Sequence, residues 1–431
     1  MEALATELLQ KLLRFETVNP PGDEREAQEW LAGVLREAGF AVELLGASPE
    51  RPNLVARLRG REEGPNLCLL SHMDTVLATA SEWQRDPWCG DVVDGEVWGR
   101  GAQDMKSQTA SEVAAAVTLA RAGWRPARGD LLVVCVVDEE TGGAQGAQWL
   151  CREHPDKVRC AWLLNEGGGS VFSVGDQRHY AICIAEKGVF RFTLTAHGRA
   201  GHASMPALAD NALPKLAPLL TALARARPAL DVTEASAGLL AGVGITVDDG
   251  PAAALRELRQ RAPELAAFVE PMLAVTFAPT MIGAGSKINV IPSQAWLKVD
   301  CRVPPGLGED DARRRIAEAL AGLDGYELSF DEEVVGNCSP AEGPLWDAIA
   351  RFVAREEPGA RVLPTMLPAF TDSRTWRATF PECTAYGFFP QREMTLHEMW
   401  PLVHGKDERI HVADLGWAAR AYHDIAVELL G

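Results

Sequence analysis

Three apolar, strand-like runs of the sequence end in side chains that can bind metals or transfer protons. The runs and the groups that follow them are 66–71 with His72 and Asp74, 131–137 with Glu139 and Glu140, and 161–164 with Glu166. In open α/β sheets, ligands bind beyond the carboxyl ends of the strands, so we expect these groups to meet at one edge of a sheet. A further carboxylate, Asp104, lies in the loop 99–106, directly before a helical stretch.

Imidazole and carboxylate groups without thiolates suit Zn²⁺, Co²⁺ or Mn²⁺, with metal availability deciding among them. One bridging carboxylate can hold two such ions about 3.5–4 Å apart. Asp74, two residues beyond His72, can accept the second ring N–H and orient the imidazole. A glutamate beside the ions can take a proton from water that they bind.

Each of these groups also has an ordinary structural explanation. A lone histidine after a strand is usually a surface or core residue, and adjacent glutamates are usually solvated loop charges. Here the acids follow the apolar run 131–137, where a carboxylate is costly unless it is paired or bound to a metal. Glycines at 142, 143 and 167–169 let the backbone approach a bound group closely. Taken together, the residues favour a metal site.

Composition excludes several classes of protein. The 431 residues include 42 Lys plus Arg and 60 Asp plus Glu, a net charge of −18, whereas binding to a phosphate backbone needs clustered cations; we expect no nucleic-acid partner. No run reaches 18 apolar residues, so we expect no membrane span. The first 13 residues form an amphipathic, acid-containing pattern unlike a secretory signal, which predicts a cytoplasmic protein.

The cysteines and the missing motifs narrow the chemistry further. Nine cysteines are scattered without a CxxC pair, which predicts free thiols in a reducing compartment and disfavours a thiolate zinc site. The strings GxSxG, GxxxxGK[ST], GxGxxG and HExxH do not occur. Their absence argues against the corresponding serine hydrolases, nucleotide-binding proteins and HExxH metalloproteases.

Strand-like runs alternate with helical stretches in the first part of the chain and again after residue 339. This alternation predicts an α/β fold with a mostly parallel sheet covered by helices on both faces. The expected strands are 53–58, 66–71, 131–137 and 161–164, and the expected helices are 109–122, 146–153 and 345–355.

Near residue 188 the pattern changes to alternating strands. The expected elements are strand 190–196, helix 211–225, strands 281–290 and 295–303, helix 311–323 and strand 326–330, with 231–275 unassigned. This β-α-β-β-α-β order is typical of a ferredoxin-like α+β domain. We therefore predict a catalytic domain at 1–187 and 336–431, interrupted by an inserted dimerisation or lid domain at 188–335.

Eight short motifs follow one another in an order that is familiar from one enzyme family. They are HMDTV, GRGAQDMK, DEETGG, NEGGG, GHASMP, KINVIP, TDSR and HGKDER, and they span residues 72–409. Asn19-Pro-Pro-Gly22 also resembles that family's N-terminal turn. The sequence resembles the di-zinc aminoacylase/carboxypeptidase family of clan MH, which includes acetylornithine deacetylase, succinyl-diaminopimelate desuccinylase, carboxypeptidase G-like enzymes and aminoacylase.

The resemblance implies two divalent ions, most of all zinc, with cobalt or manganese as alternatives. The matching ligand positions are His72 and Glu166 for the first ion, Asp104 as the bridge, and Glu140 and His404 for the second. Asp74 stands behind the first histidine, and Glu139 matches the general acid/base. Many members have aspartate at position 166, and glutamate resembles the aminoacylase-like branch. His397 is the second choice for the C-terminal histidine ligand.

The resemblance also implies roles for residues outside the ligand set. In relatives, the histidine that matches His202 comes from the partner subunit and polarises the scissile carbonyl, which implies a homodimer formed through the inserted domain. Asn289 and Arg374 resemble substrate-binding positions, and a forked guanidinium suits a free carboxylate. The alternatives are a strand-end surface histidine at 202 and a structural ion pair at 374.

The function that this resemblance implies is metal-dependent amide hydrolysis. The expected substrate is an N-acyl amino acid or dipeptide with a free carboxylate, as for an aminoacylase or carboxypeptidase, attacked by a water bridged between two metals and deprotonated by Glu139. The alternative is a biosynthetic deacylase acting on N-acetylornithine or N-succinyl-diaminopimelate. A non-catalytic binding protein is a remote alternative, which the complete ligand set disfavours.

Overall fold

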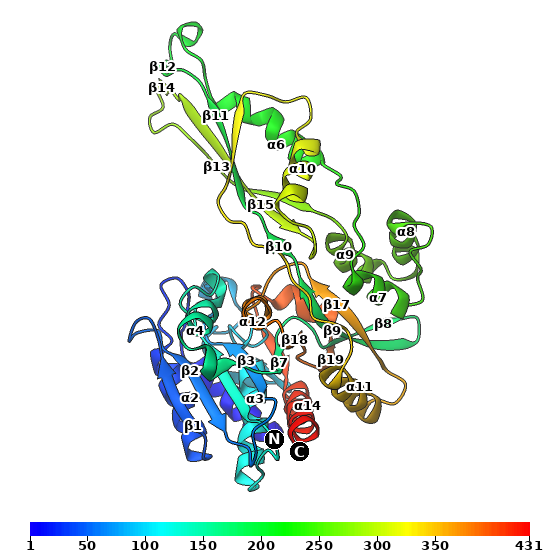
Figure 1. Cartoon of the computed structure of the whole chain (residues 1–431). Coiled ribbons are helices and arrows are strands. Elements are labelled where there is room, and N and C mark those ends of the chain that lie inside the picture. The colour runs from blue at the N-terminus through cyan, green and yellow to red at the C-terminus, as the bar shows by residue number, and fades with distance from the viewer. The chain divides into compact units, whose positions relative to one another are not determined.

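The chain forms two compact units in a computed structural model that describes all 431 residues. The first unit comprises Met1–Ile184, Ser339–Thr365 and Thr371–Gly431, and the second comprises Ala185–Cys338 and Met366–Phe370. In Figure 1 the first unit is drawn mainly in blue, cyan, orange and red, and the second in green and yellow. None of the helices could span a membrane, because each is too short or too polar.

The first unit is built on a mixed sheet of ten strands. Nine of them follow the order β1 (Ala41–Leu45), β2 (Asn53–Leu58), β6 (Leu131–Val136), β3 (Leu67–His72), β7 (Trp162–Asn165), β18 (Thr384–Gly387), β9 (Gln177–Glu186), β8 (Ser170–Val174) and β19 (Gln391–Thr395), and β17 (Arg361–Leu367) pairs with β9. The central strands β6, β3, β7 and β18 are parallel to one another. Antiparallel pairs flank them, since β1 and β2 run against their neighbours and β9 runs against β18 and β8.

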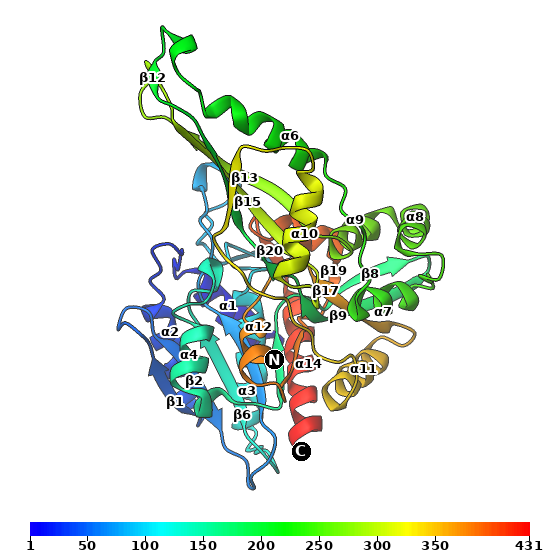
Figure 2. The same cartoon turned by 45° about the horizontal axis from the view of Figure 1, so that its top comes forward.

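Helices cover both faces of this sheet, as the apolar runs predict. They are α1 (Glu2–Leu13), α2 (Arg25–Glu37), α3 (Lys106–Arg121), α4 (Ala147–Glu153), α5 (Pro155–Val158), α11 (Pro344–Glu356), α12 (Ser373–Thr379), α13 (Leu396–Met399) and α14 (Val412–Leu430). Helices α1, α3 and α14 pack together on one face, and α4 packs beside α12 on the other; Figure 2 labels all five.

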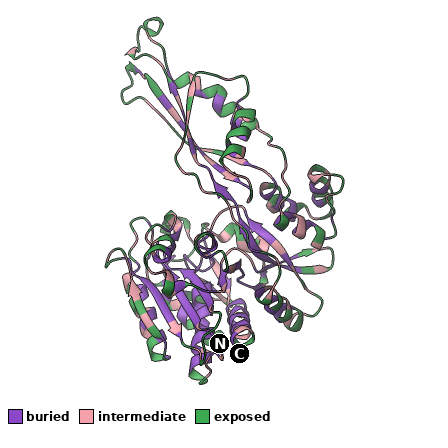
Figure 3. Ribbon diagram, in the orientation of Figure 1, coloured by how far each residue is buried: buried purple, intermediate pink, exposed green.

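Alternation along the strands explains this layering. Cys68 and Leu70 of β3 belong to a buried cluster with Leu150 of α4 and Trp376 of α12. Successive side chains of a strand point to opposite faces, so Leu67 and Leu69 face the α3 side. Every residue of β3 and β6 is buried, and Figure 3 shows both strands in the colour of buried residues. The predicted α/β class with helices on both faces is confirmed.

A small sheet completes the first unit. Strands β20 (Arg409–His411), β5 (Glu96–Trp98) and β4 (Asp91–Val93) form it in that order, so the end of the chain pairs with a segment that follows β3. This pairing brings the loop before β20 close to the loop that follows β5. Those two loops carry His404 and Asp104.

The second unit contains an antiparallel sheet with helices on one face. The strands are β10 (Gly188–Val189), β11 (Phe192–His197), β13 (Thr276–Ala284), β15 (Gln294–Val303) and β16 (Tyr326–Phe330), with a separate ribbon of β12 (Gly201–His202) and β14 (Val290–Ile291). Leu219 of α6 (Leu216–Arg225) and Ile316 of α10 (Glu309–Ala319) belong to the same buried cluster as Leu194 and Leu297 of the sheet. The order β11-α6-β13-β15-α10-β16 is the predicted ferredoxin-like order.

The structure corrects several predicted elements of the second unit. The helix expected at 211–225 begins at Leu216, after a 3₁₀ turn, and the helix expected at 311–323 ends at Ala319. The strand expected at 281–290 is β13, which begins five residues earlier at Thr276 and ends at Ala284. The prediction extended the strand over the apolar residues Ile288 and Val290, which are exposed and lie beyond its end. The unassigned region 231–275 contains three short helices, which are α7 (Glu234–Gly242), α8 (Pro251–Arg261) and α9 (Pro263–Met272).

Candidate metal centre

The carboxyl end of β3 places an imidazole between two carboxylates. His72 is the last residue of that strand and is buried. Its Nε2 lies 3.1 Å from Asp104 Oδ1 and 3.7 Å from Glu166 Oε1. Because β3, β6 and β7 are parallel neighbours, the groups that follow them meet at one sheet edge, as the sequence predicts.

A second imidazole reaches the same bridge from the far end of the chain. His404 Nε2 lies 3.0 Å from Asp104 Oδ2 and 3.2 Å from Glu140 Oε2. The two oxygens of Asp104 therefore face two different histidines. His404 has a φ of 57°, an uncommon conformation for a residue with a side chain. His411, the last residue of the small-sheet strand β20, pairs with Glu96 instead.

The donor atoms form two overlapping triplets that fit divalent cations. The ligand atoms of His72, Asp104 and Glu140 lie within 4.8 Å of one another, and so do those of His72, Glu139 and Glu166. Glu140 Oε1 is buried and has no hydrogen-bond partner, so it is available to a cation. Nitrogen and oxygen donors without sulfur match zinc, cobalt or manganese. The residues present therefore fit a metal centre.

The pKa values of this cluster are shifted because several carboxylates are buried close together. Burial, and then the Asp104 carboxylate, raises the pKa of Glu166 to about 7. Burial and the neighbouring Glu166 raise the pKa of Glu139 well above its ordinary value. Burial alone would lower the pKa of His72, but the surrounding carboxylates raise it. Divalent cations bound among these groups would neutralise the surplus negative charge.

Asp74 holds the loop that carries the two adjacent glutamates. Its Oδ1 accepts the backbone N–H of Glu139 at 3.2 Å, and its Oδ2 accepts that of Glu140 at 3.1 Å. His72 Nδ1 lies 3.0 Å from the Asp74 carbonyl oxygen and 3.6 Å from its carboxylate Oδ1. The residue thus supports both the imidazole and the glutamate loop.

Asn19 and Arg51, two residues with no predicted role, brace this loop from behind. Asn19 Nδ2 donates to Asp74 Oδ2 at 2.9 Å and to Asp138 Oδ1 at 3.2 Å. Arg51 Nη1 donates to the same Asp138 oxygen at 3.0 Å, and the other side of its guanidinium binds both oxygens of buried Glu24. Asp138 has a φ of 71°, so its neighbours hold an uncommon conformation directly before Glu139. The turn Asn19-Pro-Pro-Gly22 was the only sequence feature that pointed to this region.

The TDSR loop lies beside the same sheet edge. Asn165 Nδ2 donates to Thr371 Oγ1 at 3.3 Å and to Ser373 Oγ at 3.1 Å, which ties the loop to the end of β7. Arg374 follows this loop and is buried in the first turn of α12. Asp372 of the same loop was not predicted from the sequence, and it is buried. Burial first, and then negative neighbours such as Glu166, raise the pKa of Asp372 to about 8.

The two remaining predicted residues belong to the second unit. His202 pairs with Val290 in the β12–β14 ribbon, which places Asn289 directly beside it along the ribbon. Both residues are exposed. His202 Nδ1 lies 2.7 Å from Ser204 Oγ, which leaves Nε2 as the free end of the ring.

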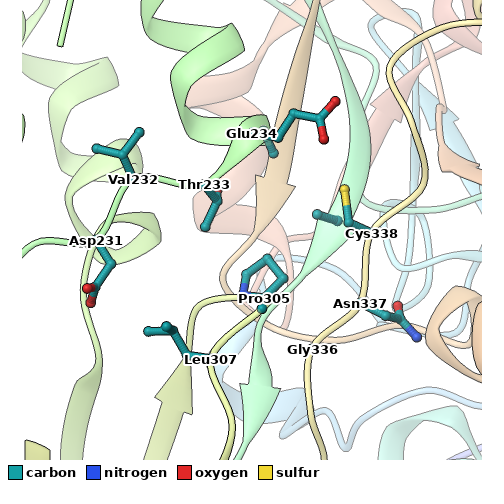
Figure 4. Close-up of a pocket in the computed structure, with 12 residues that line it drawn as sticks. Asp231, Val232, Thr233, Glu234, Pro305, Leu307, Gly336, Asn337 and Cys338 are labelled. Carbon is teal, nitrogen blue, oxygen red and sulfur yellow. The ribbon is translucent and has the colours of Figure 1, made fainter. Parts of the chain in front are cut away.

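The second unit also contains a cavity of about 480 Å³, lined in part by Asp231, Thr233, Pro305 and Cys338 (Figure 4). Thr233 caps α7 by accepting the backbone N–H of Ser236. Both clusters of metal-binding side chains lie in the first unit. The cavity is therefore not the candidate metal centre.

The sequence is similar to those of known proteins over most of its length. The sequence pattern of "Peptidase family M20/M25/M40" matches residues 68–428. A succinyl-diaminopimelate desuccinylase of Xanthobacter autotrophicus is 30% identical over 379 residues, which are 85% of this chain and 86% of that protein.

Two solved structures share the fold. An M20 family metallo-carboxypeptidase, Sso-CP2, from Sulfolobus solfataricus aligns with a TM-score of 0.76 at 16% identity, covering 98% of each chain. The Bacillus subtilis YXEP protein, described as a dinuclear metal binding peptidase from the M20 family, aligns with a TM-score of 0.59 at 16% identity, covering 100% of this chain and 98% of that one. At such low identity these likenesses establish the fold.

Proposed function

The chain belongs to peptidase family M20/M25/M40, and from this premise we propose that it is a dinuclear metal-dependent amidohydrolase. The proposed substrate is an N-acyl amino acid or a dipeptide with a free carboxylate. The observation that carries the proposal is the position of Asp104, whose two oxygens face His72 and His404 at 3.1 and 3.0 Å. A carboxylate between two imidazoles is suited to bridge two cations.

We assign the ligands from the family resemblance and from the contacts around Asp104. His72 and Glu166 would hold the first ion and Glu140 and His404 the second, with Asp104 shared between the two pairs. Zinc is the proposed metal, with cobalt and manganese as alternatives. When bound, such ions lower the pKa of water and polarise a carbonyl.

Glu139 is the proposed general base and acid. Its backbone N–H donates to Asp74, and its carboxylate lies within 4.8 Å of the donor atoms of His72 and Glu166. The carboxylate takes a proton from the attacking water and later returns it to the leaving nitrogen. Exposed Nε2 of His202, supplied by a partner subunit, donates to the carbonyl oxygen as negative charge develops there.

A substrate panel tests this function. The purified chain, loaded in turn with Zn²⁺, Co²⁺ or Mn²⁺, is assayed for amine release from N-acetyl and N-succinyl amino acids and from dipeptides. We expect hydrolysis of at least one class that carries a free α-carboxylate, and much less with the matching amides. Failure to cleave any member with all three metals would contradict the proposal.

A second candidate function is supported by the sequence relative. The succinyl-diaminopimelate desuccinylase named above is matched over most of its length, so we also consider a biosynthetic deacylase acting on N-succinyl-diaminopimelate or N-acetylornithine. The two substrates join the same panel. A kcat/KM for either that exceeds every simple N-acyl amino acid and dipeptide would favour the deacylase.

Replacing Arg374 by lysine should raise KM about 10- to 100-fold for substrates with a free carboxylate. Arg374 is buried in the first turn of α12, and lysine cannot reproduce two parallel hydrogen bonds to a carboxylate, each charged bond contributing about 1.5–3 kcal/mol. The measurement is steady-state kinetics on an N-acyl amino acid and its carboxamide. An equal effect on both substrates would contradict the assignment.

We further propose that the second unit forms a homodimer through β13. This strand lies at an edge of the sheet and pairs on one side with β15. Its adjacent residues Met281 and Ile282 are 57% and 54% exposed, and an apolar strand edge of this kind is a template for pairing with a second copy.

Replacing Met281 by aspartate should shift the chain from dimer to monomer in light scattering, whereas Val335→Asp, at an equally exposed site in a linker, should leave the dimer intact. A wild-type chain that is a monomer at assay concentrations would contradict this proposal.

If His202 acts across the dimer, two inactive variants should complement each other. His202→Ala and Glu139→Gln chains, mixed and allowed to exchange subunits, form some sites with both residues intact. We expect activity in the mixture that neither variant has alone. A mixture no more active than its components would place His202 in its own chain's site or outside the reaction.

The cysteines support a reducing, cytoplasmic location for this function. All nine are free and seven are buried. The sulfurs of Cys160 and Cys383 lie 3.7 Å apart without a bond between them. Free thiols are typical of reducing compartments, where disulfides are rare.

A further inference from the structure

One buried carboxylate, that of Glu408, binds the loop that carries Asp104. Its Oε1 accepts the backbone N–H groups of Gln103 at 2.6 Å and of Asp104 at 2.9 Å. Its Oε2 accepts the N–H of Gly101 at 3.0 Å and a guanidinium N–H of Arg100 at 2.6 Å. The side chain is fully buried, and these four donors satisfy its carboxylate in place of water.

The same assembly reaches the loop that carries His404. Arg100 is buried, and its Nη2 donates to the carbonyl oxygen of Gly405 at 2.7 Å and lies 3.4 Å from that of His404. Glu408 itself lies four residues beyond His404. The Glu408–Arg100 pair therefore ties together two loops that are 300 residues apart in the sequence and that carry one candidate ligand each.

We propose that Glu408 is a positioning residue of the metal centre, which fixes the orientation of the Asp104 bridge directly and of His404 through Arg100. The inference rests on the proposed dinuclear centre and adds a residue that touches neither the ions nor the substrate. The HGKDER motif suggested only a histidine ligand, and the structure gives its glutamate a separate task.

The reason lies in how narrowly the bridge must be oriented. Each oxygen of Asp104 faces a different imidazole at about hydrogen-bond distance, so a rotation of the loop would lose one of the two contacts. Hydrogen bonds to a charged carboxylate are stronger than neutral ones. Three such bonds from Glu408 hold the backbone N–H groups of Gly101, Gln103 and Asp104. The left-handed conformation of His404 is also costly and persists only where neighbours hold it, as Arg100 does at the next carbonyl.

The chain offers a matched control in Asp414. This residue of α14 is also fully buried, and its carboxylate accepts three backbone N–H groups, those of Arg392, Glu393 and Met394, at 2.8–3.1 Å. The segment that it holds carries no proposed ligand. Loss of the Asp414 carboxylate should therefore reduce stability without acting on the metal centre.

The experiment compares Glu408→Gln with Asp414→Asn in the full chain. Each substitution keeps the shape of the side chain but replaces one acceptor oxygen by an NH₂ group that faces N–H donors. For each variant we measure the melting temperature without metal, the number of Zn²⁺ ions bound, and their dissociation constants by competition with a chelating dye. We expect both variants to melt at lower temperature. Only Glu408→Gln should bind zinc more weakly, by about 10- to 100-fold for at least one ion, as for other residues that orient metal ligands.

A third variant keeps the proposal testable if Glu408→Gln does not fold. Glu408→Asp keeps the charge with a shorter reach, and we expect zinc dissociation constants between those of the wild type and Glu408→Gln. The proposal is overturned if Glu408 variants bind two ions as tightly as the wild type, or if Asp414→Asn weakens binding equally. A wild-type chain that binds no divalent ion would instead overturn the proposed dinuclear centre itself.

Discussion

Glu139→Gln should lower kcat about 10²- to 10⁴-fold while both divalent ions remain bound. The glutamine keeps the size of the side chain and the backbone N–H bond to Asp74, but its amide cannot take a proton from water. Glu139 lies in one triplet with His72 and Glu166, but none of the proposed ligands is altered by this substitution. The measurement pairs steady-state turnover on the best substrate of the panel with metal content of the same preparation.

Glu112→Gln is the matched control for this prediction. Glu112 is a buried glutamate of α3 whose Oε1 accepts a hydrogen bond from Gln108, and burial raises its pKa well above the ordinary value, as for Glu139. It belongs to neither ligand triplet, so its substitution should leave kcat close to that of the wild type. Turnover of Glu139→Gln within a few-fold of this control would refute the general-base role.

Asp104→Ala should abolish binding of at least one ion and reduce turnover at least about 10³-fold. The residue supplies one oxygen toward His72 and one toward His404, so its removal leaves each imidazole without the shared ligand. Polarisation by a bound ion is worth several kcal/mol of transition-state stabilisation, and each 1.36 kcal/mol is a factor of ten in rate. Metal analysis by mass spectrometry and the amine-release assay measure the two effects on one sample.

Two controls accompany this variant. Asp130→Asn alters a carboxylate that binds Arg57 and the N–H of Gly60, away from the ligand triplets, and should retain metal and activity. Chelation of the wild type should remove activity, and added Zn²⁺, Co²⁺ or Mn²⁺ should restore it. A wild-type chain that binds no transition metal near neutral pH would favour a non-catalytic binding protein.

The strands that deliver the ligands were predictable because their residues are apolar on both faces. Strands β3, β6 and β7 begin and end within one residue of the predicted 66–71, 131–137 and 161–164. Strand β13 was misplaced for the opposite reason, because an edge strand with exposed residues and Pro279 carries no continuous apolar pattern. The three short helices between 231 and 275 are rich in Ala and Leu, where period and length are poor guides.

At the candidate metal centre, residue types and motif order predicted which side chains would meet. The supporting contacts could not be predicted, because they join residues that are distant in the sequence and ordinary in type. Arg51 binds Asp138 across 87 residues, and Glu408 binds the N–H of Asp104 across 304. Nothing local marks Arg51 or Glu408 as a partner of these particular loops. The TDSR motif was recognised, but it indicated a role only for Arg374, as a binder of carboxylates, and none for Asp372.

The strand order of the first unit has a consequence for how this protein is made. Strand β18, at residues 384–387, lies between β7 and β9, which both precede the second unit in the chain. On the ribosome, the N-terminal portion therefore emerges with a gap in its sheet, and about 200 residues are synthesised before the missing strand arrives. His404 and Glu408 emerge later still. Folding of the first unit must wait until β18 and the segment with His404 and Glu408 have been synthesised, so the large sequence separation of its contacts predicts slow maturation and metal capture only after those residues emerge.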